Sequence, residues 1–226
     1  MVKITKSELH NLNSDFRRFQ TRIVESQKQD NTYFISQLNQ FKKKYKRAGQ
    51  ENTFAENIFA FAEKMRDIGI DDLPGIIFSN LMKMPFLKPQ VKEVYAIKAL
   101  EYADENGDKI HILARLVDLE KLYKQNKDMH NYKRILFREE NVLNNICNNF
   151  KNAKKTYRTY SRENSSLKKY ELELAKTRVD IAKLILKSNP QKAQIILGKA
   201  RFIFNRENRE KEVNFVDMML DEIQIK

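Results

Sequence analysis

The chain has 226 residues, of which 41% are hydrophobic and 10% aromatic, with only five Gly, four Pro and one Cys. This composition supports a folded core, excludes wholesale disorder and a disulfide scaffold, and argues against a many-stranded β fold, which would need more turn-forming residues. The formal net charge of +13 is uneven: residues 1–50 carry 11 basic and 4 acidic side chains, residues 51–150 carry 14 and 16, and residues 151–226 carry 18 and 10. Two basic ends around a nearly neutral middle predict one or two basic surfaces.

The N-terminal residues lead into polar sequence without the apolar stretch of a secretory signal, and no segment approaches the ~18 consecutive apolar residues of a membrane-spanning helix. The single cysteine, Cys147, leaves no internal disulfide to form. We therefore expect a cytoplasmic protein without a transmembrane segment.

Helical signals begin at the N-terminus. Thr5 and Glu8 fit a capping box, which predicts a helix to about residue 27. Asp30 and Asn31 can cap a second helix, which ends in a basic run before Gly49. Periodic apolar residues predict further helices at about 52–68, 73–84, 89–105 and 109–125.

The stretch from Met129 carries the longest heptad pattern in the chain. Its apolar positions run from Tyr132 to Tyr160 in steps of four and three, with Glu139 as the exception. Since no Gly or Pro occurs from 129 to 162, the pattern allows one continuous helix, which would be roughly 50 Å long. The polar run 161–166 is the predicted break before the next helix. A helix of the same chain is the favoured packing partner over a second chain.

The remaining residues predict helices at about 167–188, 190–205 and 209–224. The first of these has apolar stripes on two sides, as a helix in the middle layer of a stack requires. The total of nine or ten helices with short connections predicts an all-α fold with antiparallel neighbours. We expect one domain over 1–226, or a subdivision into N-terminal helices (1–86) and a repeat-like part (87–226).

Residues 181–204 form two apolar helices around Ser188-Asn189-Pro190 and invite comparison with a DNA-reading helix-turn-helix. The second helix carries too many large apolar residues for a polar groove-reading face, among them Ile195, Leu197 and Phe202. Exposing several such side chains would cost several kcal/mol at ~25 cal/mol per Å². We therefore expect this helix to bury its apolar residues against neighbouring helices.

The hairpin has a regular order of large and small residues. Ile181, Ala182 and Ile185 are large, small and large in the first helix, and Ala193, Leu197 and Ala200 are small, large and small in the second. This order resembles a tetratricopeptide repeat over about 174–205, although the turn is shorter and Asn205 stands near the usual proline.

Residues 113–144 are similar to a second copy of this repeat. Leu116, Leu119 and Leu136 fit the pattern, whereas Glu120 and Glu139 replace small residues. The resemblance implies a short tetratricopeptide-like α-solenoid that acts as a protein–protein interaction adaptor or scaffold, with another protein or peptide as its partner. The first helices of such repeats line the ligand groove, which implies four partner-binding candidates: Lys176, Arg178, Asp180 and Lys183.

No catalytic motif is recognisable in the sequence. His10, His111 and His130 are isolated and lack zinc-binding spacing, and Cys147 has no identifiable base beside it. The pair at 139–140 is better interpreted as solvated or capping glutamates than as an acid/base dyad. We expect no enzymatic activity, no cofactor and no metal.

Two basic clusters are candidate contacts for nucleic acid or an acidic partner. The first comprises Lys42, Lys43, Lys44, Lys46 and Arg47, and the second comprises Lys151, Lys154, Lys155, Arg158 and Arg162, which recur at helical spacing. Such ridges neutralise phosphates without reading bases. The sequence leaves four interpretations open: a solvated helix face, an acidic protein partner, nucleic acid or a membrane surface. The alternative function is therefore a nucleic-acid-binding helical protein.

Overall fold

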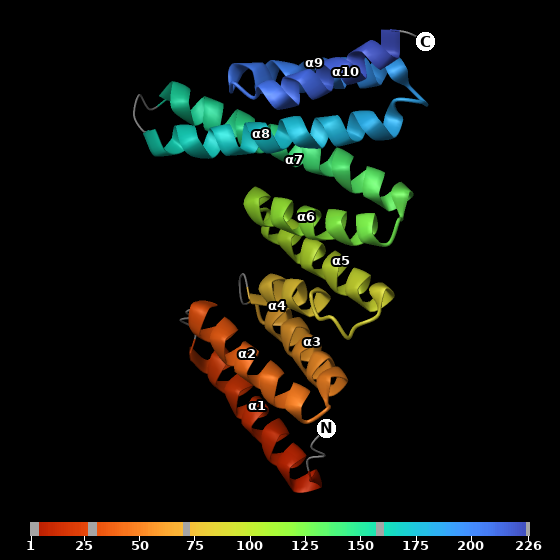
Figure 1. Ribbon diagram of the computed structural model, residues 1–226. Helices are drawn as coiled ribbons and strands as arrows, with labels where there is room; N and C mark the ends of the chain where they lie inside the picture. The colour runs from red at the N-terminus through yellow and green to blue at the C-terminus, as the bar shows by residue number, and fades with distance from the viewer. Residues whose placement is uncertain (1–4, 27–30, 70–72, 157–160, 225–226) are drawn as a thin grey trace. The chain divides into compact units, whose positions relative to one another are not determined.

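The computed structural model describes residues 5–26, 31–69, 73–156 and 161–224. These ranges contain ten α-helices and no strand (Figure 1). The helices are α1 (Lys6–Ser26), α2 (Asn31–Arg47), α3 (Glu51–Asp67), α4 (Leu73–Met82), α5 (Pro89–Asn106), α6 (Lys109–Gln125), α7 (Met129–Thr156), α8 (Ser161–Ile185), α9 (Pro190–Arg206) and α10 (Glu210–Gln224). The predicted all-α fold of stacked helical hairpins is confirmed.

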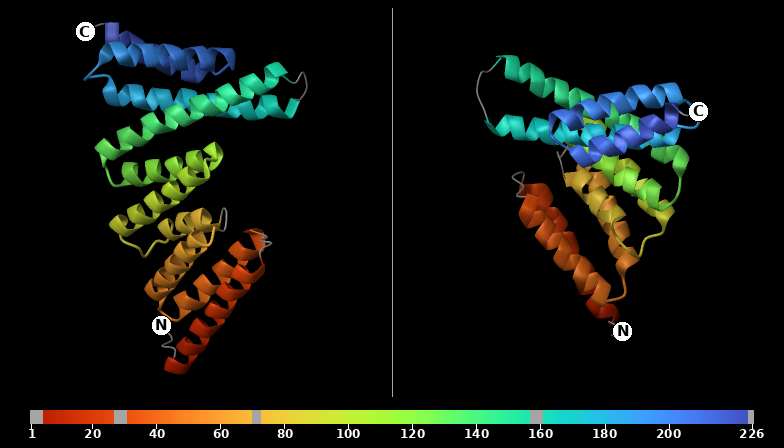
Figure 2. Two further views of the ribbon diagram at one scale, coloured as in Figure 1. Left: turned by 180° about the vertical axis from the view of Figure 1, so that it is seen from behind. Right: turned by 45° about the horizontal axis from the view of Figure 1, so that its top comes forward.

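Contacts between helices divide the chain after Asn106 into two compact units. The first unit holds α1 to α5 and the second holds α6 to α10, and within each unit every helix packs against the next one in the chain. Both views in Figure 2 show α8, α9 and α10 side by side in the second unit. The subdivision suggested at residue 86 falls between α4 and α5, which pack extensively against each other.

Local signals in the sequence account for most helix boundaries. The Thr5 N–H donates to Glu8 Oε2 at 2.7 Å and the Glu8 N–H donates to Thr5 Oγ1 at 3.2 Å, so the predicted capping box is confirmed. Asn189 caps α9 by accepting from the Lys192 N–H at 3.0 Å. Gly49 follows α2 with a φ of 67°, a left-handed conformation that ends a helix at little cost only for glycine.

Aromatic rings fill the core of the first unit where α1, α2 and α3 meet. The ring centroids of Phe16 and Phe41 lie 5.0 Å apart, and those of Tyr45 and Phe54 lie 5.2 Å apart. The Tyr45 hydroxyl donates to Asn13 Oδ1 at 2.7 Å, so its polar end is satisfied although the ring is buried. Such ring pairs contribute about 0.5–1.5 kcal/mol each beyond the area they bury.

The α8–α9 hairpin forms the centre of the second unit. The positions that carry the repeat-like pattern are all buried, with exposed fractions of at most 3%: Ile181, Ala182, Ile185, Ala193, Leu197 and Ala200. Small residues at the contact let two helices approach closely, and the large residues fill the remaining space. The predicted packing of this hairpin is therefore confirmed.

Two apolar residues of α9 depart from the expectation that the helix buries all of them. Ile195 is 61% exposed and Phe202 is 67% exposed, so the prediction is wrong at these positions. The buried face contains Ala193, Leu197 and Ala200. Two residues beyond position 193 correspond to about 200° around a helix of 3.6 residues per turn, so Ile195 lies on the face of α9 opposite the buried one. Phe202 lies two turns further along the same outer face.

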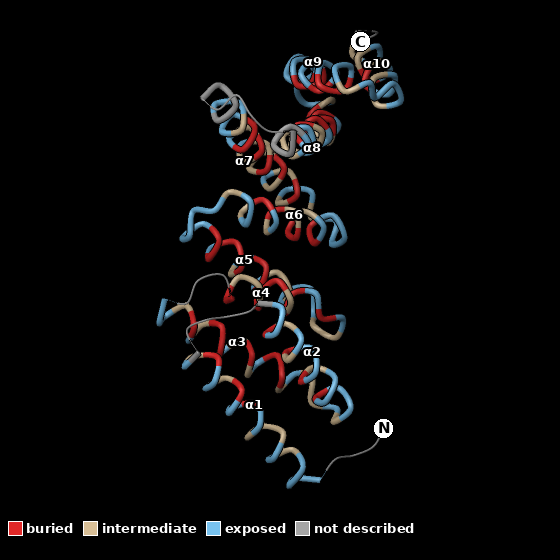
Figure 3. Tube along the Cα trace, turned by 90° about the vertical axis from the view of Figure 1, so that its left-hand side faces the viewer, coloured by how far each residue is buried: buried red, intermediate tan, exposed pale blue. Residues whose placement is uncertain are grey.

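The boundary between α7 and α8 also differs from the sequence expectation. Helix α7 ends at Thr156, and the polar run 161–166, predicted to break the helix, forms the first turns of α8. Serine and asparagine are tolerated in a first helical turn, so composition alone did not locate this boundary. Helix α8 packs against both α7 and α9, as its two apolar stripes predicted, and Figure 3 shows its buried residues in red.

Each helix in the described ranges is too short or too polar to span a lipid bilayer.

Candidate interaction surface

Three of the four predicted partner-binding residues share one face of α8. Lys176, Asp180 and Lys183 recur at helical spacing, and both lysines are exposed. The Lys176 ammonium lies 3.0 Å from the Glu173 carboxylate, and the Lys183 ammonium lies 2.9 Å from the Asp180 carboxylate. Exposed pairs of this kind contribute about 0–1 kcal/mol, so a partner's charges could displace them at little cost.

These three residues line a groove that α8 forms with α10. The groove has a volume of about 330 Å³ and also includes Phe215 and Lys211 of α10. The Phe215 ring is 44% exposed, and the Lys183 ammonium lies 5.1 Å from the ring centroid. The surface therefore combines an exposed aromatic ring, a residue type enriched at protein interfaces, with charges of both signs, which suit the polar rim of an interface.

Arg178, predicted with these residues, lies on the other side of α8. It is 9% exposed, its Nε donates to Glu140 Oε1 at 2.9 Å, and its Nη2 donates to Asn144 Oδ1 at 3.0 Å. Position 178 is about 200° around the helix from position 176, so its side chain points towards α7. The guanidinium therefore holds α7 and α8 together and does not line the α8–α10 groove.

The basic cluster at 42–47 lies on the last turns of α2 in the first unit. Lys43, Lys44, Lys46 and Arg47 are exposed, and none of them forms an ion pair with a carboxylate among the residues that the structure describes. The Lys44 ammonium lies 5.5 Å from the Phe41 ring centroid. Cations at a helix C-terminus interact favourably with the helix dipole, which accounts for part of the clustering.

The second basic cluster is described only at its first member. Lys151 is an exposed residue whose ammonium lies 2.9 Å from Glu171 of α8. The side chains of Lys154, Lys155, Arg158 and Arg162 lie outside the described residues. The interpretation of 151–162 as a phosphate-binding ridge therefore stays a prediction, and Lys151 is already paired with a carboxylate.

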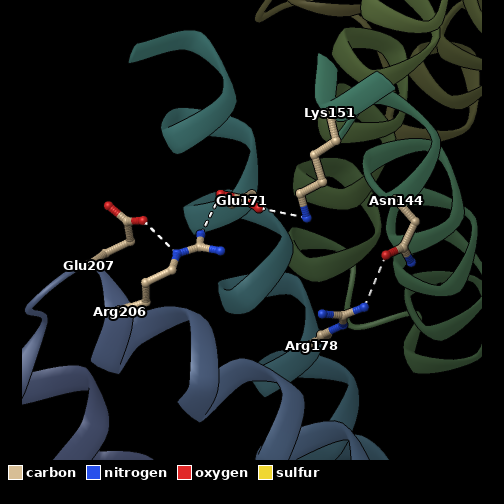
Figure 4. A network of polar contacts seen from close by, with 6 residues as sticks. All are labelled: Asn144, Lys151, Glu171, Arg178, Arg206 and Glu207. Carbon is tan, nitrogen blue, oxygen red and sulfur yellow. Dashed lines mark hydrogen bonds and ion pairs between the residues drawn. The ribbon is translucent and has the colours of Figure 1, made fainter. Parts of the chain in front are cut away.

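Glu171 is the centre of a polar network between α7, α8 and α9 (Figure 4). Its side chain is 5% exposed and pairs with Lys151 of α7 and with Arg206 of α9. The Arg206 Nε also donates to Glu207 Oε1 at 3.0 Å. Because the Glu171 carboxylate is buried and paired on both sides, removing either cation would leave it partly uncompensated.

Glu139 is a buried carboxylate and not the solvated or capping group that the sequence suggested. It is 5% exposed, its Oε1 accepts from Thr177 Oγ1 at 3.1 Å, and its Oε2 has no hydrogen-bond partner within the described part of the chain. Burial, followed by the negative charge of Glu120, raises the pKa of Glu139 to about 7. The same surroundings raise the pKa of Tyr132 to about 12, with burial again the first cause and the Asp180 charge the second.

The groups considered for catalysis do not come together. His10 and His130 are exposed, and His111 Nδ1 of α6 lies 3.5 Å from the carboxylate of Asp108, the N-cap of that helix. Burial and the Glu171 charge raise the pKa of the Cys147 thiol to about 11, so it stays protonated near neutral pH. Across the described ranges, no three His, Cys, Asp or Glu side chains are placed to hold a metal ion.

Sequence reasoning missed the exposed residues that border two grooves. The apolar periodicity places Phe215 in the last helix without indicating its exposure, and it predicts that Ile195 and Phe202 are buried. A signal was present, because Ile195 and Phe202 are seven residues apart and fall outside the repeat-like packing positions.

A comparison of the chain with protein-family models and with curated proteins finds no match.

Proposed function

We propose that this chain is a non-enzymatic protein–protein interaction adaptor or scaffold of the tetratricopeptide-like type. The observation that carries the proposal is the α8–α10 groove, where Lys176, Asp180 and Lys183 lie beside the exposed ring of Phe215. Helical repeats bind extended or helical peptides through polar and aromatic side chains presented by their first helices. The burial of the repeat-like positions in α8 and α9 supports the same proposal.

The chemistry of the groove favours a peptide over a small polar metabolite. Its apolar floor is formed by Val179 and Phe204, which are buried, and its rim carries lysines and carboxylates. A volume of about 330 Å³ is at the lower end of ligand pockets and suits one anchoring side chain of a peptide. Aromatic residues such as Phe215 are enriched in the buried centre of protein interfaces.

Affinity purification tests this proposal with the intact chain as bait in an extract of the cells that produce it. We expect Phe215→Ser to lose proteins that both wild type and Phe202→Ser retain, because Phe215 borders the α8–α10 groove and Phe202 does not. Both phenylalanines are exposed, so far-UV circular dichroism should show an unchanged fold. Identical protein sets for all three baits would refute the proposal.

A nucleic-acid-binding protein is the second candidate, supported by the exposed cations at the end of α2. If these cations neutralise several phosphates, the affinity for nucleic acid should fall steeply as the salt concentration rises. Lys43→Glu combined with Lys46→Glu should abolish retention on immobilised RNA and DNA while leaving the fold intact, because both side chains are exposed. Retention that is absent, or that does not change with salt, would remove this candidate.

A further inference from the structure

A second groove in the same unit lies between α7, α8 and α9. Its volume is about 540 Å³, and its lining includes six residues of α9, of which Ile203 is buried and the other five are Ile195, Gly198, Lys199, Phe202 and Arg206. On a helix of 3.6 residues per turn, the five positions other than 203 form one continuous stripe along the face opposite the one that α9 buries. The groove shares no lining residue with the α8–α10 groove.

The stripe exposes two large apolar side chains beside the charged residues Lys199 and Arg206. Ile195 is 61% exposed and Phe202 is 67% exposed, although every other large apolar residue of α9 is buried. The two side chains are seven residues apart, which is about 10 Å along the axis. This is the spacing at which a second helix presents its own apolar residues to the first.

Gly198 lies between them without a structural reason within the chain. A Cβ atom built at Gly198 would meet nothing within 4 Å. A helix with glycine in its interior is less stable than one with alanine there, and no neighbouring atom would clash with an alanine at position 198. A bare backbone between two apolar side chains lets another backbone approach closely, as small residues do where helices cross.

The charge of this surface selects the kind of partner. The lining carries four cations (Lys151, Arg178, Lys199 and Arg206) and one carboxylate (Glu171). Positive charge remains in excess when the flanking ion pairs to Glu140 and Glu207 are included. The contacts drawn in Figure 4 fix the positions of Arg178 and Arg206, whereas exposed Lys199 pairs with no carboxylate in the described ranges.

We propose that the α7–α9 groove binds an acidic amphipathic α-helix of a partner protein. The helix lays its apolar stripe on Ile195 and Phe202 across Gly198, and a flanking carboxylate pairs with Lys199. A second copy of this chain fits less well, because a self-complementary contact would bring Lys199 and Arg206 close to the same cations of the other copy. Extended phosphate backbones fit less well because Lys151, Arg178 and Arg206 are already paired with carboxylates.

Selection from displayed peptides tests this proposal with the intact chain as target. One library presents helix-forming peptides with a randomised apolar stripe flanked by glutamates, and a matched library carries lysines in place of the glutamates. We expect enrichment from the glutamate library only. The enriched helices should bind Phe202→Ser and Lys199→Glu at least tenfold more weakly than wild type, and Phe215→Ser with unchanged affinity.

Three results of the selection would overturn the proposal. They are a failure to enrich glutamate helices, equal enrichment of lysine helices, and binding that Phe202→Ser leaves unchanged. Self-association that Phe202→Ser abolishes, measured by analytical ultracentrifugation, would assign the groove to a second copy and also overturn it. Because Phe215→Ser tests the α8–α10 groove and Phe202→Ser tests this one, either proposal can fail without the other.

Discussion

The buried carboxylate of Glu139 allows a sharp test of how tightly α7 and α8 pack. Its Oε1 accepts from Thr177 at 3.1 Å, and its Oε2 has no partner among the described residues. Burial and the nearby charge of Glu120 raise the pKa of Glu139 from 4.5 to about 7. Glu139→Gln keeps the shape of the side chain and its acceptor for Thr177, and it removes the charge.

The sign of the effect follows from the direction of the pKa shift. Because the pKa is higher in the folded chain, neutral Glu139 stabilises the fold fully below about pH 4.5, and this contribution is lost as the pH rises through about 7. At 1.36 kcal/mol per pKa unit, the shift corresponds to roughly 3 kcal/mol. The Gln variant does not titrate, so its free energy of unfolding should gain about this amount relative to wild type between about pH 4.5 and pH 8.

Urea unfolding followed by far-UV circular dichroism across this pH range measures the difference. The exposed carboxylate of Glu222 on α10 supplies the matched control, and Glu222→Gln should follow the wild-type pH dependence closely. The reasoning is refuted if the difference between wild type and Glu139→Gln stays constant with pH. Such a result would mean that the Glu139 carboxylate is hydrated.

Four further single substitutions and one double variant test packing in the two units by urea unfolding. Gly198→Ala should raise the free energy of unfolding by about 1 kcal/mol, since its Cβ would meet nothing within 4 Å. Gly75→Ala should raise the free energy of unfolding by less, because its Cβ would lie 3.3 Å from a ring carbon of Tyr102. Leu197→Ala should lower it by about 2–5 kcal/mol, because Leu197 is fully buried, and a loss well below this range would contradict the packing of α9. Arg178→Ala should lower the free energy of unfolding by about 3 kcal/mol, because it leaves the Glu140 carboxylate uncompensated. The double variant Arg178→Met with Glu140→Gln should recover part of that loss. Equal losses for the two variants would show that the ion pair is unimportant.

Phe202 and Phe215 connect these packing arguments to the two proposed interaction surfaces. Both are exposed aromatic side chains in the second unit, on α9 and α10, and they border different grooves. Each serves as the control for the other, because a general loss of stability or solubility would affect both variants alike. A binding defect confined to one variant therefore identifies the groove that the partner occupies.

Local sequence determined where most helices begin and end. The capping box at Thr5 and Glu8, the Asn189 cap before Pro190 and the left-handed Gly49 act over three or four residues, so they are visible in the sequence. Helical periodicity also predicted that Ile181 and Leu197 are buried, because the large and small residues of one hairpin are close in sequence. The α7–α8 boundary escaped prediction because its serines and asparagines suit a helix start as well as a break.

The tertiary structure decided which apolar and charged residues have a neighbour. Periodicity shows that Ile195 and Phe202 share a face of α9, but only the positions of α7 and α8 show that this face stays uncovered. Arg178 and Glu140 are 38 residues apart, and their ion pair depends on how closely two helices approach. Such contacts form only after the helices pack, so the sequence determined the helices and the packing determined the candidate surfaces.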